Sequence, residues 1–222
     1  MGLESPLEIY PGEPTILEIH NKVLFSRVCQ SLTTCDISSA PESFSVWSED
    51  EEELHINTAF IKIQTPLDLP WDDKALSVTL YRLVEQRLYE EFETREEIEQ
   101  LAREINSHIN EFSLQVEGNY GFTIEWDLRR YLKAFAFRPI VDSSASIFDN
   151  LILFLEICSD MKINQSLLFI NLKLFLSENE LKEFYNQVFF LGLRVLMLES
   201  IPDNRVFLRE RKRCIDLHFL ES

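Results

Sequence analysis

One group of charged residues has the spelling of a metal-dependent nuclease site. Pro202 and Asp203 are followed by Glu210, Arg211 and Lys212. Nucleases of this kind hold a metal ion with acids and position the attacking water with a lysine. Their ExK group usually lies on a strand, whereas here it lies in a polar, arginine-rich stretch. We therefore interpret the match as an ordinary charged loop and keep a metal-dependent nuclease as an alternative hypothesis.

The sequence offers no loop for binding phosphate groups. Such loops need glycines, as in GxxxxGK[ST], because backbone N–H groups must close around the phosphates. The chain has only 5 glycines, and none lies in Ile19–Val23, which follows the first predicted strand. Asn171 stands where a magnesium-binding Asp would end a buried strand. We expect neither ATP hydrolysis nor a nucleotide cofactor.

The cysteines and histidines are too scattered to spell a local metal motif. No CxxC spacing links the cysteines, which are Cys29, Cys35, Cys158 and Cys214. The histidines also occur singly, at His20, His55, His108 and His218. Buried free thiols are the expectation for such cysteines in a reducing compartment, and no zinc site is predicted.

Two clusters of basic residues stand out in a chain whose net charge is −17. That charge excludes a generally basic coat but leaves room for a local basic surface. The first cluster is Arg129, Arg130, Lys133 and Arg138, and the second is Arg205, Arg209, Arg211, Lys212 and Arg213. They either pair with the acidic surplus or form a phosphate-binding surface, which would be strengthened if an oligomer brings several copies together.

Apolar patterns at both ends of the chain predict an α/β domain. Strands are expected at Thr15–Ile19, near Phe44–Trp47, at 59–64, at 166–172, at 194–199 and at 214–220, with a possible strand start at Ile140–Val141. Asn21, Ser143 or Ser144, and Ser177 are expected to cap three helices. Strands joined by helices must cross over, so the sheet should be mostly parallel. These elements make up a head domain of residues 1–70 and 138–222.

The middle of the chain predicts an all-helical leg at residues 71–137. Apolar residues recur at helical spacing from Leu76 to Leu88, and again from Ile98 to Phe112 after a polar break near Thr94. A further helix is expected at 124–137. The apolar seam of the two long helices is narrow, so we expect it to pack against a partner subunit as well.

No segment has the features of a membrane span or a signal peptide. The longest apolar runs fall short of the roughly 18 residues that a span requires. Gly2–Pro14 carries acids and prolines in place of an apolar core. A soluble, cytoplasmic protein is the expectation.

Several segments together resemble the CRISPR-associated adaptation protein of type II-A systems, the small fourth Cas protein. They are TILEI at 15–19, SIFDNLILFLEICSDM at 146–161, SLLFINLKLFLSENEL at 166–181, RVLMLES at 194–200 and DLHFL at 216–220. The similarity spans nearly the whole chain and lies in its apolar strands, with no catalytic signature. The chain would be a divergent member of that family.

The resemblance implies a degenerate P-loop-like head without Walker motifs, a helical leg and no enzymatic activity. It also implies a homotetrameric ring that binds the ends of double-stranded DNA through a basic inner hole. The function would be spacer acquisition in antiviral defence, with the CRISPR integrase and the effector nuclease as partners. An alternative from another class is a protein-interaction scaffold that binds Cas proteins and never contacts DNA.

DNA-contacting residues and a calcium site complete these expectations. The residues that we expect to neutralise phosphates are Arg129, Arg130, Lys133, Arg138 and Lys162. The resemblance implies bound calcium, but the matching stretch offers only Glu117, Glu125 and Asp127. Calcium prefers six to eight oxygen ligands, so we assign no individual metal ligand.

Overall fold

Five short apolar segments pair into one parallel sheet in the computed structural model, which describes residues 5–34, 40–142, 144–218 and 220–221. The strands are β1 (Thr15–Ile19), β4 (Phe60–Ile63), β5 (Ser166–Ile170), β6 (Val195–Glu199) and β7 (Arg211–Ile215). Their order in the sheet is β4-β5-β6-β1-β7, and every pair is parallel. The predicted α/β fold with a mostly parallel sheet is confirmed.

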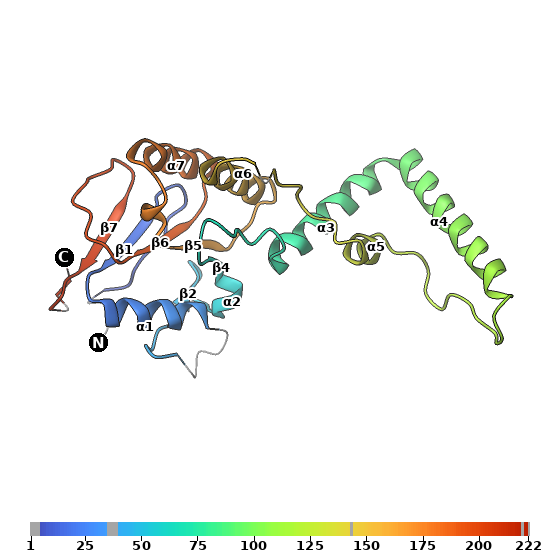
Figure 1. Ribbon diagram of the computed structural model, residues 1–222, viewed down its shortest axis with the longest axis horizontal. Coiled ribbons are helices and arrows are strands. Elements are labelled where there is room, and N and C mark those ends of the chain that lie inside the picture. Colours follow the sequence, from blue (N-terminus) through green and yellow to red (C-terminus); the bar gives the residue numbers. More distant parts are fainter. Residues whose placement is uncertain (1–4, 35–39, 143, 219, 222) are drawn as a thin grey trace. The chain divides into compact units, whose positions relative to one another are not determined.

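Helices cover both faces of this sheet (Figure 1). Alternate residues of the strands, among them Leu17, Ile19 and Leu196, pack against apolar side chains of α1 (Lys22–Thr33). On the opposite face lie α6 (Ile147–Asp160) and α7 (Glu178–Leu191), where the ring of Phe169 meets that of Phe184 edge-on. This two-sided cover explains why β1 and β6 are buried along their entire length.

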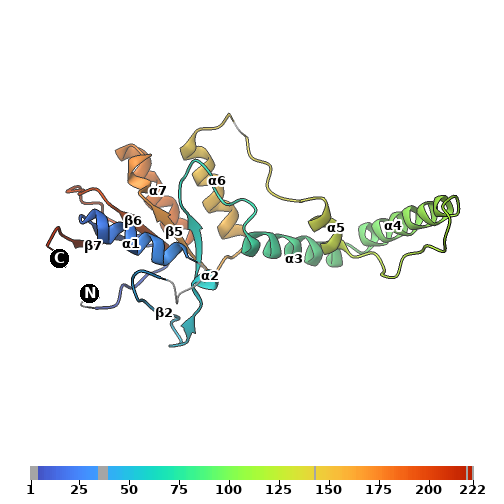
Figure 2. The ribbon, with the colours of Figure 1, turned by 60° about the horizontal axis from the view of Figure 1, so that its bottom comes forward.

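The chain divides into two compact units. The head unit comprises Met1–Asp73 and Ile140–Ser222, and the helical unit comprises Lys74–Pro139. The head unit also holds a small antiparallel pair, β2 (Val46–Trp47) and β3 (Glu53–Leu54), and the short helix α2 (Ile56–Ala59) (Figure 2). The helical unit holds α3 (Lys74–Glu90), α4 (Phe92–Ser113) and α5 (Leu128–Ala134).

Local capping chemistry sets several of these boundaries as predicted. The side chain of Asn21 accepts hydrogen bonds from the backbone of Val23 and Leu24 at the start of α1. Ser177 and Glu180 form a reciprocal capping box at the start of α7, and Gly192 ends that helix in the left-handed conformation. The predicted cap of α6 was wrong, because the side chain of Ser146 caps this helix and that of Ser144 does not. The other predicted cap, Ser143, lies outside the described residues.

Other predicted boundaries were wrong for local reasons. The helix predicted at 124–137 is only α5, because Asp127 caps its first turn and Ala136 adopts a positive φ of 48° just after it. The strand predicted at 166–172 stops at Ile170, since Asn171 has a φ of 52° and begins the 3-10 turn η2 (Leu172–Leu174).

Three further boundaries also shift. The break between the long helices lies at Glu91 and not near Thr94. No strand forms at Ile140–Val141, where Ile140 is fully exposed. The last strand runs from Arg211 to Ile215 and not to residue 220, because the Asp216 side chain turns the backbone by accepting from the N–H groups of His218 and Leu220.

Candidate functional site

The short helix α5 exposes a group of positive charges. Arg129, Arg130 and Lys133 are all exposed on it, and Arg129 and Lys133 share one face because they are four residues apart. The guanidinium of Arg129 binds the carboxylate of Glu85 on α3, with its Nε 2.8 Å from Oε2. Within the described part of the chain, neither Arg130 nor Lys133 forms an ion pair with an acid, so their charges face solvent.

The remaining two predicted DNA contacts are also exposed. Arg138 follows α5 in the helical unit, and Lys162 follows α6 in the head unit with a positive φ of 51°. Neither forms an ion pair within the described residues. Four of the five predicted positions therefore keep a solvent-facing charge, and Arg129 is the exception.

The second basic cluster is largely neutralised within the head unit. Arg205, Arg211 and Arg213 pair with Asp203, Glu13 and Glu221 at 2.8, 3.2 and 3.1 Å. Arg209 lies over the ring of Phe189, 3.6 Å from its centroid. Of the two interpretations of this cluster, the structure supports pairing with acidic residues over a phosphate-binding surface.

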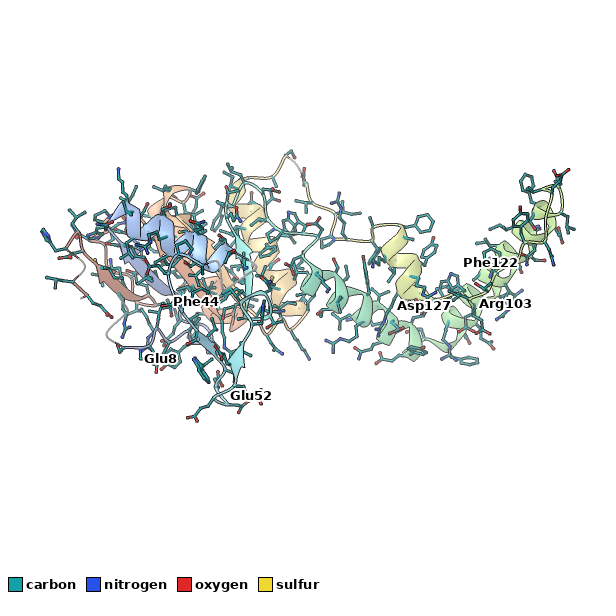
Figure 3. All side chains as sticks on the ribbon, turned by 90° about the horizontal axis from the view of Figure 1, so that it is seen from below. Glu8, Phe44, Glu52, Arg103, Phe122 and Asp127 are labelled. Atoms are coloured by element: carbon teal, nitrogen blue, oxygen red, sulfur yellow. The ribbon has the colours of Figure 1, made fainter. Side chains whose placement is uncertain are left out.

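The acids that the resemblance pointed to for calcium do not meet. Glu125 and Asp127 line a groove of about 440 Å³ in the helical unit, together with Glu85, Glu99, Arg95 and Arg103. Asp127 and Arg103, two residues of this lining, are labelled in Figure 3. Glu117 does not line it. In the described residues, the three carboxylates do not form a group within ligand distance. Asp127 already accepts a hydrogen bond from the Arg130 N–H. These residues do not fit the six to eight oxygens of a calcium site.

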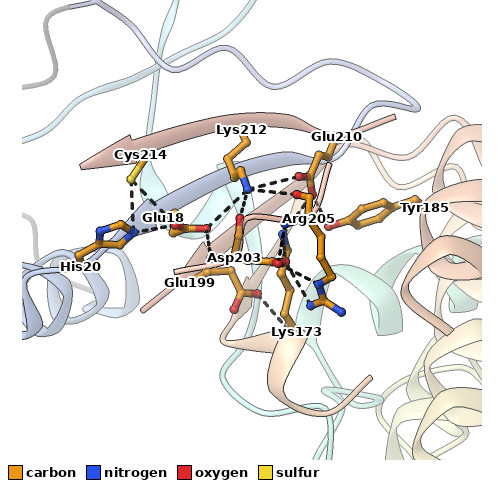
Figure 4. Close-up of polar contacts among 10 residues, drawn as sticks. All are labelled: Glu18, His20, Lys173, Tyr185, Glu199, Asp203, Arg205, Glu210, Lys212 and Cys214. Atoms are coloured by element: carbon orange, nitrogen blue, oxygen red, sulfur yellow. Dashed lines mark hydrogen bonds and ion pairs between the residues drawn. The ribbon is translucent and has the colours of Figure 1, made fainter. Parts of the chain in front are cut away.

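A buried network of charges lies where the β6–β7 connection crosses β1 (Figure 4). Lys173 is its centre, because its ammonium lies 3.1 Å from Asp203 Oδ2 and 3.1 Å from Glu210 Oε2. The Tyr185 hydroxyl donates to Glu210 at 3.0 Å, and Lys212 lies 3.7 Å from the same carboxylate. The network binds the β6–β7 connection, in which the described residues form no helix, to the sheet.

Burial and neighbouring charges shift pKa values within this network. Burial raises the pKa of Glu199 to about 7, although the Lys173 N–H donates to it at 3.1 Å. Burial also acts to raise the pKa of Asp203, but hydrogen bonds from Arg205 and Lys173 outweigh it and hold that pKa well below its ordinary value. Burial raises the pKa of Tyr185, which keeps its hydroxyl a donor.

The structure brings the nuclease-like residues together, but a lysine side chain of the protein occupies the position between their carboxylates. Asp203, Glu210 and Lys212 meet in the network, but the Lys173 ammonium lies between the two carboxylates. A catalytic metal would have to displace that ammonium. The arrangement is therefore that of an internal salt bridge, and sequence spacing gave no sign of Lys173's part in it.

The connection after β1 leaves no room for a phosphate loop. His20 hydrogen-bonds through its N–H to the Ile215 carbonyl at 2.9 Å, and α1 begins at Lys22. The turn from strand to helix is thus only two residues long. This geometry agrees with the absence of a glycine-rich motif from the sequence.

One polar cluster escaped the sequence analysis altogether. Glu18, His20 and Cys214 lie with their ligand atoms within 4.8 Å of one another, the sole such acid, histidine or cysteine group among the residues described. The cysteine lies 194 residues from the histidine, so no spacing rule could find the pair. The thiols are less buried than predicted, since only Cys158 is fully buried, whereas Cys29 and Cys214 are half-buried. Cys35 lies outside the described residues.

These features define the structural class of the protein. The chain is an α/β protein with a five-stranded parallel sheet, a buried ion network on the β6–β7 connection, and an all-helical insertion. In the part of the chain that the structure describes, no helix is long and apolar enough to cross a membrane.

Comparison with known families then gives the particular identification. The sequence matches the family of CRISPR-associated proteins Cas_Csn2 over residues 38–215, and the chain belongs to this family. No curated protein matches it. Among solved structures, the fold is similar to that of Stu0660 of Streptococcus thermophilus, with a TM-score of 0.55 and 19% sequence identity. The match covers 90% of this chain and 66% of that chain, just under two thirds of its length.

Proposed function

We propose that this chain is a non-catalytic protein that binds the ends of double-stranded DNA as a homotetrameric ring during spacer acquisition. It acts in the cytoplasm, in antiviral defence, together with the CRISPR integrase and effector nuclease. The observation that carries the proposal is a set of solvent-facing bases in a member of a CRISPR-associated family. The charges that no acid of the described residues neutralises, in a chain that is strongly acidic elsewhere, are those of Arg130, Lys133, Arg138 and Lys162.

Phosphate neutralisation is the chemistry that such residues perform. Lysine and arginine side chains on a surface release counterions from DNA and give binding that weakens steeply with salt. Contacts of this kind neutralise phosphates without selecting a base sequence. Arg129 contributes less than its neighbours, because Glu85 already compensates its charge.

An uncovered apolar seam supports the assembly into a ring. Leu101, Ile105, Ile109 and Phe112 recur at three- and four-residue spacing on α4 and are 57, 57, 49 and 66% exposed. A stripe this apolar is costly to leave in water. A second copy of the chain, with the same stripe, is the partner that this proposal assigns to it.

The test compares linear and closed-circular double-stranded DNA of one sequence by gel shift, with calcium, with magnesium and with chelator. Binding to linear DNA alone, without cleavage, is expected. The variant Arg130→Ala/Lys133→Ala should bind linear DNA more weakly, by roughly tenfold at moderate salt. Lys182→Ala/Arg194→Ala removes the same charge from the head unit and is the matched control, which should bind as wild type does.

The other outcomes separate the alternatives. No binding to either DNA form would support the scaffold hypothesis, in which the protein binds only Cas proteins. Degradation of linear DNA in magnesium would return Asp203, Glu210 and Lys212 to consideration as a nuclease site. Equal weakening in the control variant would mean that the bases of α5 have no special part.

A further inference from the structure

We propose that Glu18, His20 and Cys214 bind a transition-metal cation, with Zn²⁺ as the expected ion. The three side chains supply a carboxylate, an imidazole and a thiol, which are the ligand types of zinc sites. They come from β1, from the residue directly after β1, and from β7 (Figure 4). Nothing in the proposed DNA-binding function uses them.

The register of the sheet places these side chains on one face. Glu18 and Cys214 are direct partners in the parallel pairing of β1 with β7. Neighbouring partners on adjacent strands point to the same side of a sheet, and so does a residue two positions further along. His20 is that residue, and its N–H bond to the Ile215 carbonyl fixes its backbone beside β7. The site is therefore positioned by the backbone.

The distances between the donor atoms have the size of a tetrahedral zinc site. His20 Nε2 lies 2.6 Å from Glu18 Oε1 and 3.3 Å from Cys214 Sγ, and the sulfur lies 3.9 Å from the same oxygen. Zinc–ligand bond lengths and tetrahedral angles put such donors about 3.3–3.6 Å apart. Side-chain shifts of under about 1 Å would convert the observed triangle into that geometry.

Surrounding groups hold the carboxylate in the required orientation. Glu18 uses Oε2 to accept a hydrogen bond from the Asp203 N–H at 3.1 Å, and Lys212 Nζ lies 3.8 Å from the same oxygen. Its other oxygen, Oε1, is thereby directed toward His20 and Cys214. An outer ring of contacts that fixes a ligand in this way is characteristic of metal sites.

The same geometry disfavours a catalytic cysteine relay. In such a relay the histidine meets the nucleophile with one ring nitrogen and the orienting acid with the other. Here both Cys214 and Glu18 approach Nε2 of His20. The three donor atoms converge on one region and do not form the linear series of a relay. This arrangement allows them to bind a single cation.

The donor set also selects the kind of metal. Thiol and imidazole ligands suit zinc and related transition metals, whereas calcium and magnesium prefer oxygen. Three protein ligands leave a fourth position for water or for an atom of a partner. The His20 side chain is 20% exposed, which gives the cation a path from solvent.

The test is a titration of the full chain, stripped of metal with chelator, with Zn²⁺ by calorimetry and with Co²⁺ by absorption. Co²⁺ reports on the ligands, because a thiolate ligand produces a charge-transfer band. One metal ion per chain and such a band are expected for wild type, with no comparable binding of Ca²⁺. Cys214→Ser should abolish the band and weaken Zn²⁺ binding by at least about 100-fold, and His20→Gln should also weaken it. Cys29→Ser is the matched control and should behave as wild type does.

A second measurement tests the proposal even if the Cys214 and His20 variants do not fold. Zn²⁺ should raise the melting temperature of wild type and of Cys29→Ser, because binding to the native state stabilises it. The proposal is overturned by wild type that shows neither a band nor a thermal shift. It is also overturned by a band that persists in folded Cys214→Ser, which would place the thiolate ligand elsewhere.

Discussion

The two compact units use charged residues in opposite ways. In the head unit, Lys173, Asp203 and Glu210 are nearly inaccessible and bound to one another. In the helical unit, Arg130 and Lys133 are exposed, and so is an apolar seam on α4. A buried ion network is sensitive to the loss of any one of its partners, whereas charges and apolar groups that face water are available to other molecules. We therefore assign a structural role to the buried charges of the head unit, and we assign the binding of partners to the helical unit.

The largest effect is expected where this contrast is strongest, at Lys173. Lys173→Ala leaves Asp203 and Glu210 buried without their shared cation, which should lower the free energy of unfolding by about 3–5 kcal/mol. Urea denaturation measures this loss. Lys182→Ala is the control, because its pair with Glu178 is exposed to solvent and its loss should change the free energy of unfolding far less. Equal losses in the two variants would erase the distinction between internal and solvent-facing charges.

Glu199 should make the head unit sensitive to pH. Its pKa is raised to about 7 in the folded protein, so the native state binds the proton more tightly than the unfolded state does. The resulting stability is present below about pH 4.5 and is lost as the pH rises through 7, a change of about 3 kcal/mol. Glu199→Gln should remove this component in unfolding measured from pH 4.5 to 8. A wild-type pH profile that superimposes on that of the variant would contradict it, and Glu183→Gln, exposed on α7, is the control.

The apolar seam of α4 should govern assembly. Leu101→Asp/Ile105→Asp places charges in a stripe that we assign to a second copy, so association should weaken at least about tenfold. Light scattering after size exclusion measures the mass, with four chains expected for wild type and fewer for the variant. Leu208→Asp is the control, since Leu208 is 98% exposed in the head unit. Wild type that elutes as a single chain would leave the seam without its assigned partner.

The smallest effect separates two adjacent arginines. Arg130→Ala should reduce the slope of log K against log salt by about 0.9, as expected for the loss of one phosphate contact. Arg129→Ala should change it less, because Glu85 already binds that guanidinium. DNA-binding isotherms at several salt concentrations measure both slopes. A larger change for Arg129 would mean that it leaves Glu85 when DNA binds.

The sequence was most informative where short-range chemistry decides the structure. Asn21 and Ser177 begin helices as predicted, and the apolar runs at 166–170 and 195–199 are buried parallel strands. Predicted element boundaries were wrong where a single residue adopts an unusual backbone conformation. Asn171 and Ala136 adopt positive φ values that no periodicity announces, and each ends an element early.

The polar sites were less accessible to sequence analysis than the fold. Lys173 approaches Asp203 and Glu210 from 30 and 37 residues away, and Cys214 approaches His20 from 194 residues away. Such meetings depend on strand order and register, which spacing does not encode. The bases of α5 were easier to find, because they are neighbours both in the sequence and on the helix.

The order of strands has a consequence for how the chain is made. β1 lies between β6 and β7, so both of its partners are synthesised more than 170 residues after it. At a synthesis rate of about 5–20 residues per second, this strand emerges from the ribosome roughly 10–40 seconds before either neighbour exists. During that interval its five residues, all buried in the finished protein, have two open edges. The sheet can be completed only after β7, its last strand to be synthesised, has emerged from the ribosome.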